Sequence, residues 1–230
     1  DWRTLETNTN WEDQAYQKAN LKSFDFTANG GNDKTQFALG LGYIDQDGIL
    51  IGNAFKRFSG RLNLDHKATE KLSFGLNIMM SNSINNRLST DNAFATPIQL
   101  AAQAPITPVR DKDGNLYSNA EYIPGVGYAA MSYYPATMEL VNSNFVVNGF
   151  RNLVGVNATY KITNDLKLIG EYGLDLLTQH DDRYQNEYTD TGISVGGYGQ
   201  SRWTRALNFT GGGMLVWDKV INQHDFSITG

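Results

Sequence analysis

Hydrophobic and polar residues alternate with a period of two along eight stretches of the chain, a pattern that predicts β-strands with one apolar face. The strands are expected near 21–29, 35–44, 55–65, 71–81, 146–162, 166–177, 202–217 and 223–230. Tight turns are expected at 30–34, 66–70, 163–165 and 218–222, and long connections at 45–54, 82–145 and 178–201. Turns that are short at one end and long at the other are typical of an outer-membrane β-barrel wall, whose long loops face outside.

The two faces of these strands differ in polarity, which supports a barrel wall more strongly than their lengths do. The apolar face carries no charge and includes Phe24, Leu39, Leu62, Leu76, Val156, Leu168 and Phe209. The opposite face is polar or small, and we expect seven of its side chains to face an aqueous lumen: Arg61, Asn63, Asn77, Asn157, Glu171, Asp175 and Asn208. Alternation of lipid-facing and lumen-facing residues is a property of membrane barrels.

A soluble β-sandwich also alternates, with the apolar face as its core. The aromatic residues favour the barrel. Phe26, Phe37, Tyr160, Trp217 and Phe226 are expected near the tight turns, and Tyr43, Phe58 and Tyr172 toward the long loops, as in the aromatic girdles of barrels. The predicted strands also exceed the ~5–6 residues usual in globular sheets and reach the ~9–11 needed to cross a bilayer.

Composition narrows the possible functions. No apolar stretch is long enough for a membrane-spanning helix, although the chain is 40% hydrophobic. The net charge of −5 and the scattered basic residues argue against nucleic-acid binding. Both ends of the chain are expected to be internal to a longer protein, because Asp1 does not open a signal peptide and Gly230 ends a strand-like run. A connection as long as 82–145 also favours a wall wider than eight strands.

No enzyme, metal site or cofactor is predicted. The three histidines, His66, His180 and His224, have no paired spacing and are expected to be polar surface residues. The Asp-Gly pairs near 47 and 113 resemble calcium loops only superficially and are better explained as turns. Glu171 and Asp175 are four residues apart on one strand, ~13 Å, which is too far for a glycosidase pair.

The connection 82–145 is expected to be an ordered external loop, because it contains all five prolines of the chain and a set of tyrosines. Its candidate contacts with a substrate or a lid are Tyr117, Tyr122, Tyr128, Tyr133 and Tyr134. Packing of these rings within the loop, together with interfacial anchoring, is the alternative that the sequence favours.

Several motifs match one family in order and spacing. They are NWED at 10–13, GGNDKT at 30–35, LGYIDQDGI at 41–49, FKRF at 55–58 and RLNLD at 61–65, followed by a proline-rich stretch with a D-G turn at 105–114 and a strand at 166–175. This series resembles the SusC/RagA-like TonB-dependent transporters of the outer membrane. The resemblance covers most of the chain and is weakest within 115–145 and 178–200.

The resemblance implies a barrel of about 22 strands, of which residues 1–230 would form a central part of the transmembrane domain, with the plug and both termini of the full protein absent. It implies a protein in the outer membrane of a Gram-negative bacterium that imports glycans, oligopeptides or similar nutrients. The implied partners are membrane lipid, TonB and a SusD-like surface lipoprotein. A non-transporting barrel or adhesin, and a soluble β-sandwich binding module, remain the alternatives.

Overall fold

The computed structural model describes residues 7–88, 103–110, 113–115, 122–123, 127–128, 140–189, 191–192 and 194–230. Its main feature is one sheet of eight antiparallel strands. The strands are β1 (Leu21–Gly31), β2 (Thr35–Asp47), β3 (Ala54–Lys67), β4 (Leu72–Arg87), β7 (Ser143–Lys161), β8 (Leu166–Gln185), β9 (Tyr198–Ile221) and β10 (His224–Thr229). A short helix, α1 (Glu12–Ala15), precedes the sheet, and β5 (Tyr122–Ile123) pairs with β6 (Gly127–Tyr128). No helix in the described ranges has the length and apolar character to cross a membrane.

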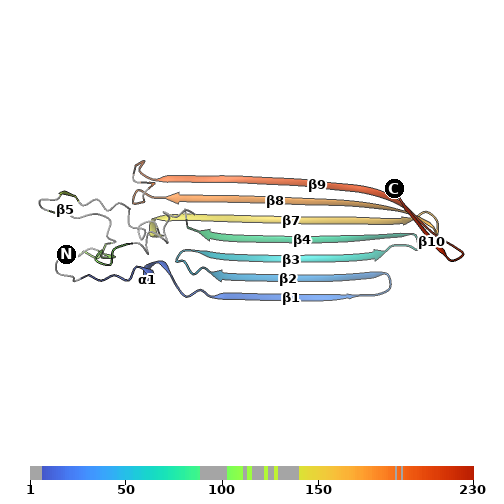
Figure 1. Ribbon diagram of the computed structural model, residues 1–230, viewed down its shortest axis with the longest axis horizontal. Helices are drawn as coiled ribbons and strands as arrows, with labels where there is room; N and C mark the ends of the chain where they lie inside the picture. The colour runs from blue at the N-terminus through green and yellow to red at the C-terminus, as the bar shows by residue number, and fades with distance from the viewer. Residues whose placement is uncertain are drawn as a thin grey trace.

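The strands are arranged up and down in chain order, as predicted, with β4 next to β7. Figure 1 shows the tight turns after β1, β3, β7 and β9 at one end of the sheet and the longer connections at the opposite end. We call these the tight-turn end and the long-loop end. The predicted sorting of short and long connections between the two ends is therefore confirmed.

Side-chain oxygens close three of the four tight turns. Asn32 Oδ1 accepts hydrogen bonds from the backbone N–H groups of Lys34 and Thr35, both at 2.9 Å. Thr69 and Thr163 use their hydroxyl oxygens in the same way. The fourth turn uses Asn222 in the left-handed region, at a φ of 59°. Asn and Thr are favoured in turns because they can make these local bonds or adopt this conformation.

Each strand pair keeps a single register along its whole length, so the faces can be followed across the sheet. Leu39 pairs with Leu62, Leu62 with Ile78, Ile78 with Val154, Val154 with Leu174 and Leu174 with Phe209. Directly paired residues share a face. The apolar residues predicted for one face therefore form continuous rows.

The apolar face is not covered by protein within the described ranges. Phe24 is 66% exposed and Phe209 59% exposed, and the only second sheet there is the two-residue pair β5–β6. A sandwich would need a sheet packed on this face. The structure therefore favours the barrel wall over the sandwich.

The register shows that the strands are tilted relative to the line of tight turns. Gly31, at the end of β1, is in register through the intervening strands with Gly212, nine residues before the end of β9 at Ile221. Nine residues of ~3.4 Å over six strand spacings of ~4.8 Å give a tilt of about 45°. Outer-membrane barrels have tilts of ~35–45°. Figure 1 shows the same stagger, with each tight turn lying further along than the previous one.

The strands extend further toward the long-loop end than the sequence predicted. β4 continues to Arg87, β7 begins at Ser143, and β8 and β9 extend the wall to Gln185 and Tyr198. The long connections therefore shorten to 48–53, 88–142 and 186–197. These extensions lack apolar alternation, so their strand pairing left no hydrophobic signal.

Two of the eight aromatic positions were predicted wrongly. Phe26 is the middle residue of β1 rather than a tight-turn residue. Tyr172 is the seventh of the 20 residues of β8 and so lies nearer the tight turn than the long loop. Tyr172 pairs with Val156 on β7, which in turn pairs with Leu76 on β4. Tyr172 therefore belongs to the middle of the apolar face.

Candidate functional site

The seven polar residues predicted for the lumen lie on a single face of the sheet. Asn63 pairs with Asn77, Asn157 with Glu171, and Asp175 with Asn208. All seven line two shallow, adjoining hollows on this face. A hollow of about 450 Å³ is lined by Arg61, Asn63, Asn77, Asp175 and Asn208, and a hollow of about 520 Å³ by Asn77, Asn157 and Glu171. We call this surface the polar face.

An ion pair joins two strands on the polar face. Arg151 on β7 donates to both carboxylate oxygens of Asp175 on β8, with Nε–Oδ1 at 3.1 Å and the second N–O distance at 2.8 Å. Both side chains are partly exposed to solvent, so the pair contributes little to stability. Sequence reasoning identified Asp175 but missed Arg151, because pairs diagonal to the register cannot be seen without the register.

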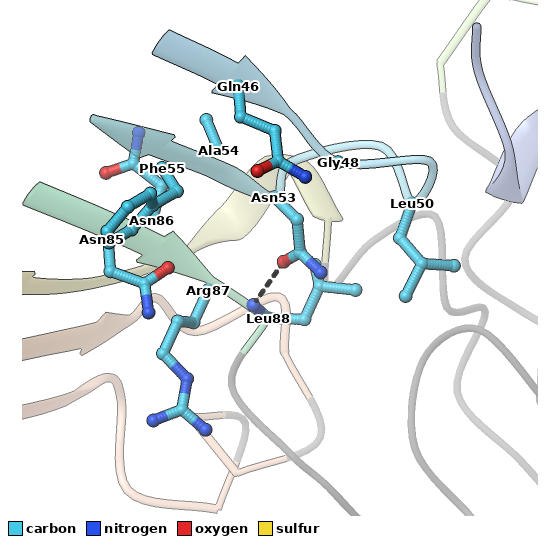
Figure 2. A pocket seen from close by; sticks show the side chains of 10 residues that line it. All are labelled: Gln46, Gly48, Leu50, Asn53, Ala54, Phe55, Asn85, Asn86, Arg87 and Leu88. Carbon is cyan, nitrogen blue, oxygen red and sulfur yellow. Dashed lines mark hydrogen bonds between the residues drawn. The ribbon is translucent and has the colours of Figure 1, made fainter. Parts of the chain in front are cut away.

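A pocket of about 310 Å³ lies at the long-loop end, where β2, β3 and β4 meet the connection 48–53. Figure 2 shows its lining, in which the amide groups belong to Gln46, Asn53, Asn85 and Asn86. Asn53 Oδ1 accepts the backbone N–H of Leu88 at 3.0 Å, which closes the end of β4 against the connection. The other amides can donate and accept hydrogen bonds. We call this pocket the rim pocket.

Aromatic and basic side chains lie together on the polar face toward the long-loop end of the sheet. The Arg87 guanidinium lies 5.3 Å from the centre of the Phe145 ring on the neighbouring strand. Arg183 on β8 has the same relation to Tyr198 on β9, at 5.6 Å. In a cation–π contact the guanidinium is attracted to the face of the aromatic ring, which helps to fix the positions of both side chains. This end of the polar face therefore offers amide, guanidinium and aromatic groups together.

The segment before β1 folds back onto the long-loop end and clips the long connection. Trp11 is 4% exposed and its Nε1 donates to the carbonyl of Ala104 at 3.1 Å. Ala15 is buried beside it, and Val109 and Leu140 pack against both. Thr9 adds two hydrogen bonds, from N to the Pro105 carbonyl and from Oγ1 to the Thr107 carbonyl, both at 2.7 Å. We call this unit the Trp11 clip. In the sequence Trp11 stands out only as part of the NWED motif, and nothing in the pattern predicts its contact with Ala104.

The structure describes only two of the five candidate tyrosines. Tyr117, Tyr133 and Tyr134 lie outside the described residues. The backbones of Tyr122 and Tyr128 pair with each other in the β5–β6 hairpin. A contact of these tyrosines with a substrate or a lid therefore stays a prediction.

The histidines do not come together. His66 Nδ1 is 2.8 Å from the Thr35 hydroxyl, and His180 stacks on Trp203. In the described ranges there is no group of three or more His, Cys, Asp or Glu side chains that could hold a metal ion.

Comparison with known proteins gives consistent results. No protein-family model matches the chain. "TonB-dependent receptor P3" of Formosa agariphila is 22% identical over 229 residues, which are 97% of this chain and 22% of the relative. "TonB-dependent receptor SusC" of Bacteroides thetaiotaomicron is 26% identical over 179 residues, 72% of this chain and 18% of the relative. The chain thus spans about a fifth of the length of these curated relatives.

Solved structures agree with the fold. The RagAB peptide importer in the 'closed-closed' state matches with a TM-score of 0.75 and 19% identity, over 96% of this chain and 25% of the matched chain. The 'open-open' state of the same importer gives a TM-score of 0.74 at the same coverage. These comparisons confirm the resemblance stated from the motifs, and the relatives are receptors and importers rather than enzymes.

Proposed function

We propose that this chain is a segment of a barrel of the SusC/RagA-like TonB-dependent receptors and forms part of the wall of an outer-membrane nutrient transporter. In this proposal residues 1–230 belong to the transmembrane barrel domain. The tight turns face the periplasm, the connections 48–53, 88–142 and 186–197 face outside, and the polar face lines the lumen. The plug and the TonB contact are supplied by other parts of the full protein.

The observation that carries the proposal is the height of the apolar band. On β9 the outward positions from Leu207 to Trp217 are all uncharged, between Arg205 and Lys219. These ten residue steps measure ~34 Å along the strand, or about 24 Å along the membrane normal at a 45° tilt. Barrels present an apolar band of ~25 Å to lipid.

The edges of the sheet support a larger wall. In the described part of the chain the two outermost strands of the sheet, β1 and β10, each pair on one side only, with β2 and β9. An open strand edge is not tolerated within lipid, because its N–H and C=O groups lack partners. We therefore propose that further strands of the same protein continue the sheet on both sides.

The substrate class is an oligopeptide or glycan taken up with a SusD-like surface lipoprotein. The rim pocket and the polar face support this class, since amide, guanidinium and aromatic groups match ligands with many hydrogen-bonding groups. The similarity to an importer of peptides, RagAB, favours peptides, and the resemblance of the motifs to the SusC/RagA-like family keeps glycans as the second candidate.

The test uses the full-length protein in its native host. We expect a strain lacking the gene to lose growth on one nutrient class, peptide or glycan, and to regain it with the intact gene but not in a strain without TonB. A lipoprotein should co-purify with the transporter. Uptake that is independent of TonB, or a deletion strain that grows on every substrate offered, would favour the adhesin alternative.

A second variant tests the long connection. Deleting 117–134, most of which lies outside the described residues, should leave the barrel able to insert because the strands make their own hydrogen bonds. Uptake or co-purification of the lipoprotein should fall. A deletion that leaves both unchanged would show that partner contacts lie elsewhere.

A further inference from the structure

The outward face of the sheet changes abruptly in character at one row of paired residues near the long-loop end. Between this row and Lys219 the outward positions of β8 and β9 are uncharged, as in the rows of Leu176 with Leu207 and Leu174 with Phe209. Above it, charged and aromatic side chains take the same outward positions. On β8 and β9 they are His180, Asp182, Trp203 and Arg205. We call this group the outer collar.

The outer collar is a built cluster. The rings of His180 and Trp203 stack with centroids 3.9 Å apart and planes 12° apart. His180 Nε2 is held 2.8 Å from the hydroxyl of Ser201 and 3.1 Å from Asp182 Oδ1. Trp203 is nevertheless 70% exposed, more than any other large apolar side chain of the described residues. The stack therefore fixes an indole that remains open toward the outside of the barrel.

Arg205 is the charge of this cluster closest to the apolar band. It lies two residues from Trp203 on the same side of β9, next to Leu207, and its direct partner on β8 is Thr178. Within the described ranges Arg205 has no acidic partner. The acid of the outer collar, Asp182, pairs with Ser201, four residues beyond Arg205 on β9, and contacts His180. A guanidinium in this position has all its donors available.

The height of Arg205 suggests what it binds. It directly follows the apolar band of about 24 Å derived from the tilt, at the level where lipid headgroups meet the protein. Trp is favoured at this level because its ring is amphipathic, and Arg suits phosphate because its planar fork forms two parallel hydrogen bonds.

We propose that the outer collar is a binding site for the phosphorylated headgroup of an outer-leaflet glycolipid. Arg205 pairs with a headgroup phosphate, and Trp203, held by His180, stacks on the adjoining sugar. This site goes beyond the proposed transport function and rests only on the orientation of the barrel in the membrane.

The experiment measures lipid retention on the full-length transporter by native mass spectrometry, with lipid A as the probe. Arg205→Gln should retain about fivefold less lipid A than the unaltered protein, the effect of one basic side chain at an anionic surface. Trp203→Ala should also lower retention. The matched control is Arg202→Gln, which removes a charge from the opposite face of the same strand and should leave retention unchanged. Heat-modifiable migration in gels confirms that each variant is folded.

Three results would overturn the proposal. One is equal retention by Arg205→Gln and Arg202→Gln. Another is equal retention of lipid A and of lipid A stripped of its phosphates by the unaltered protein. The third is displacement of lipid A by inorganic phosphate, which would show a site for the free anion. Failure of the protein to insert into membranes would instead refute the transporter itself, so the two failures are distinguishable.

Discussion

Replacing Leu76 by Arg tests the assignment of the two faces most directly. Leu76 is the fifth of the 16 residues of β4 and is flanked by Leu64 and Val156, its direct partners on the outward face. On β4 the outward positions are apolar without interruption from Leu72 to Met80, so Leu76 lies at the centre of this apolar stretch. An Arg at the midplane of a barrel costs ~2–4 kcal/mol, and near the interface ~0–1 kcal/mol. At 1.4 kcal/mol per tenfold change, Leu76→Arg should lower the folding equilibrium by about 30- to 700-fold.

The matched control is Asn77→Arg, one residue away and on the polar face, between Asn63 and Gly155. We expect its cost to stay below ~1 kcal/mol because the new charge remains in water. Reversible denaturant unfolding of the full-length barrel in lipid vesicles measures both values. Met80→Arg, toward the interface, should fall between them. Equal costs for Leu76→Arg and Asn77→Arg would refute the assignment of lipid and lumen to the two faces.

Three further predictions concern single contacts. In a double-mutant cycle, Arg151→Ala and Asp175→Ala should couple only weakly in the free energy of unfolding, because the pair is partly exposed; strong coupling would mean that it is buried in the complete protein. Trp11→Ala should raise protease cleavage within 103–110 without changing the unfolding of the strands, and Trp11→Phe should have a smaller effect; unchanged cleavage would show that the Trp11 clip does not hold the connection. Thr163→Ala should cost about 1 kcal/mol because two backbone N–H groups lose their acceptor, and Thr163→Ser should restore it; equal stability of both variants would assign no role to the hydroxyl.

The sequence predicted the parts of the fold that lipid constrains. Alternation identified all eight strands of the sheet, and the register confirms the faces because paired apolar residues meet in rows such as Leu62 with Ile78. Alternation did not predict the strand segments on the long-loop side of the apolar band. The stretch from Ser81 to Asn86 contains a single apolar residue, Ile84, and therefore shows no apolar alternation, yet it pairs fully with β3 and β7. In water, backbone hydrogen bonds extend the wall without requiring any hydrophobic pattern.

The candidate site was predictable to the same extent. The face on which a side chain lies could be predicted from the alternation of positions along each strand, and all seven lumen candidates share the polar face. Contacts between distant segments could not. Trp11 meets Ala104 across 93 positions, and the rim pocket forms only where β2, β3 and β4 end together. Such contacts depend on the register of the whole sheet and on the path of the long connection.

The tilt shows how far the strands extend beyond the apolar band at each end of the wall. A strand tilted by about 45° needs only ~10 residues to cross the apolar band, and β9 has 24. On β9 four residues from Asp218 to Ile221 lie below the band, and nine from Tyr198 to Ala206 lie above it. The excess is therefore on the side of the long connections. In the proposed orientation, the sheet there is a rigid support outside the lipid, and the rim pocket, the Trp11 clip and the outer collar are built on it.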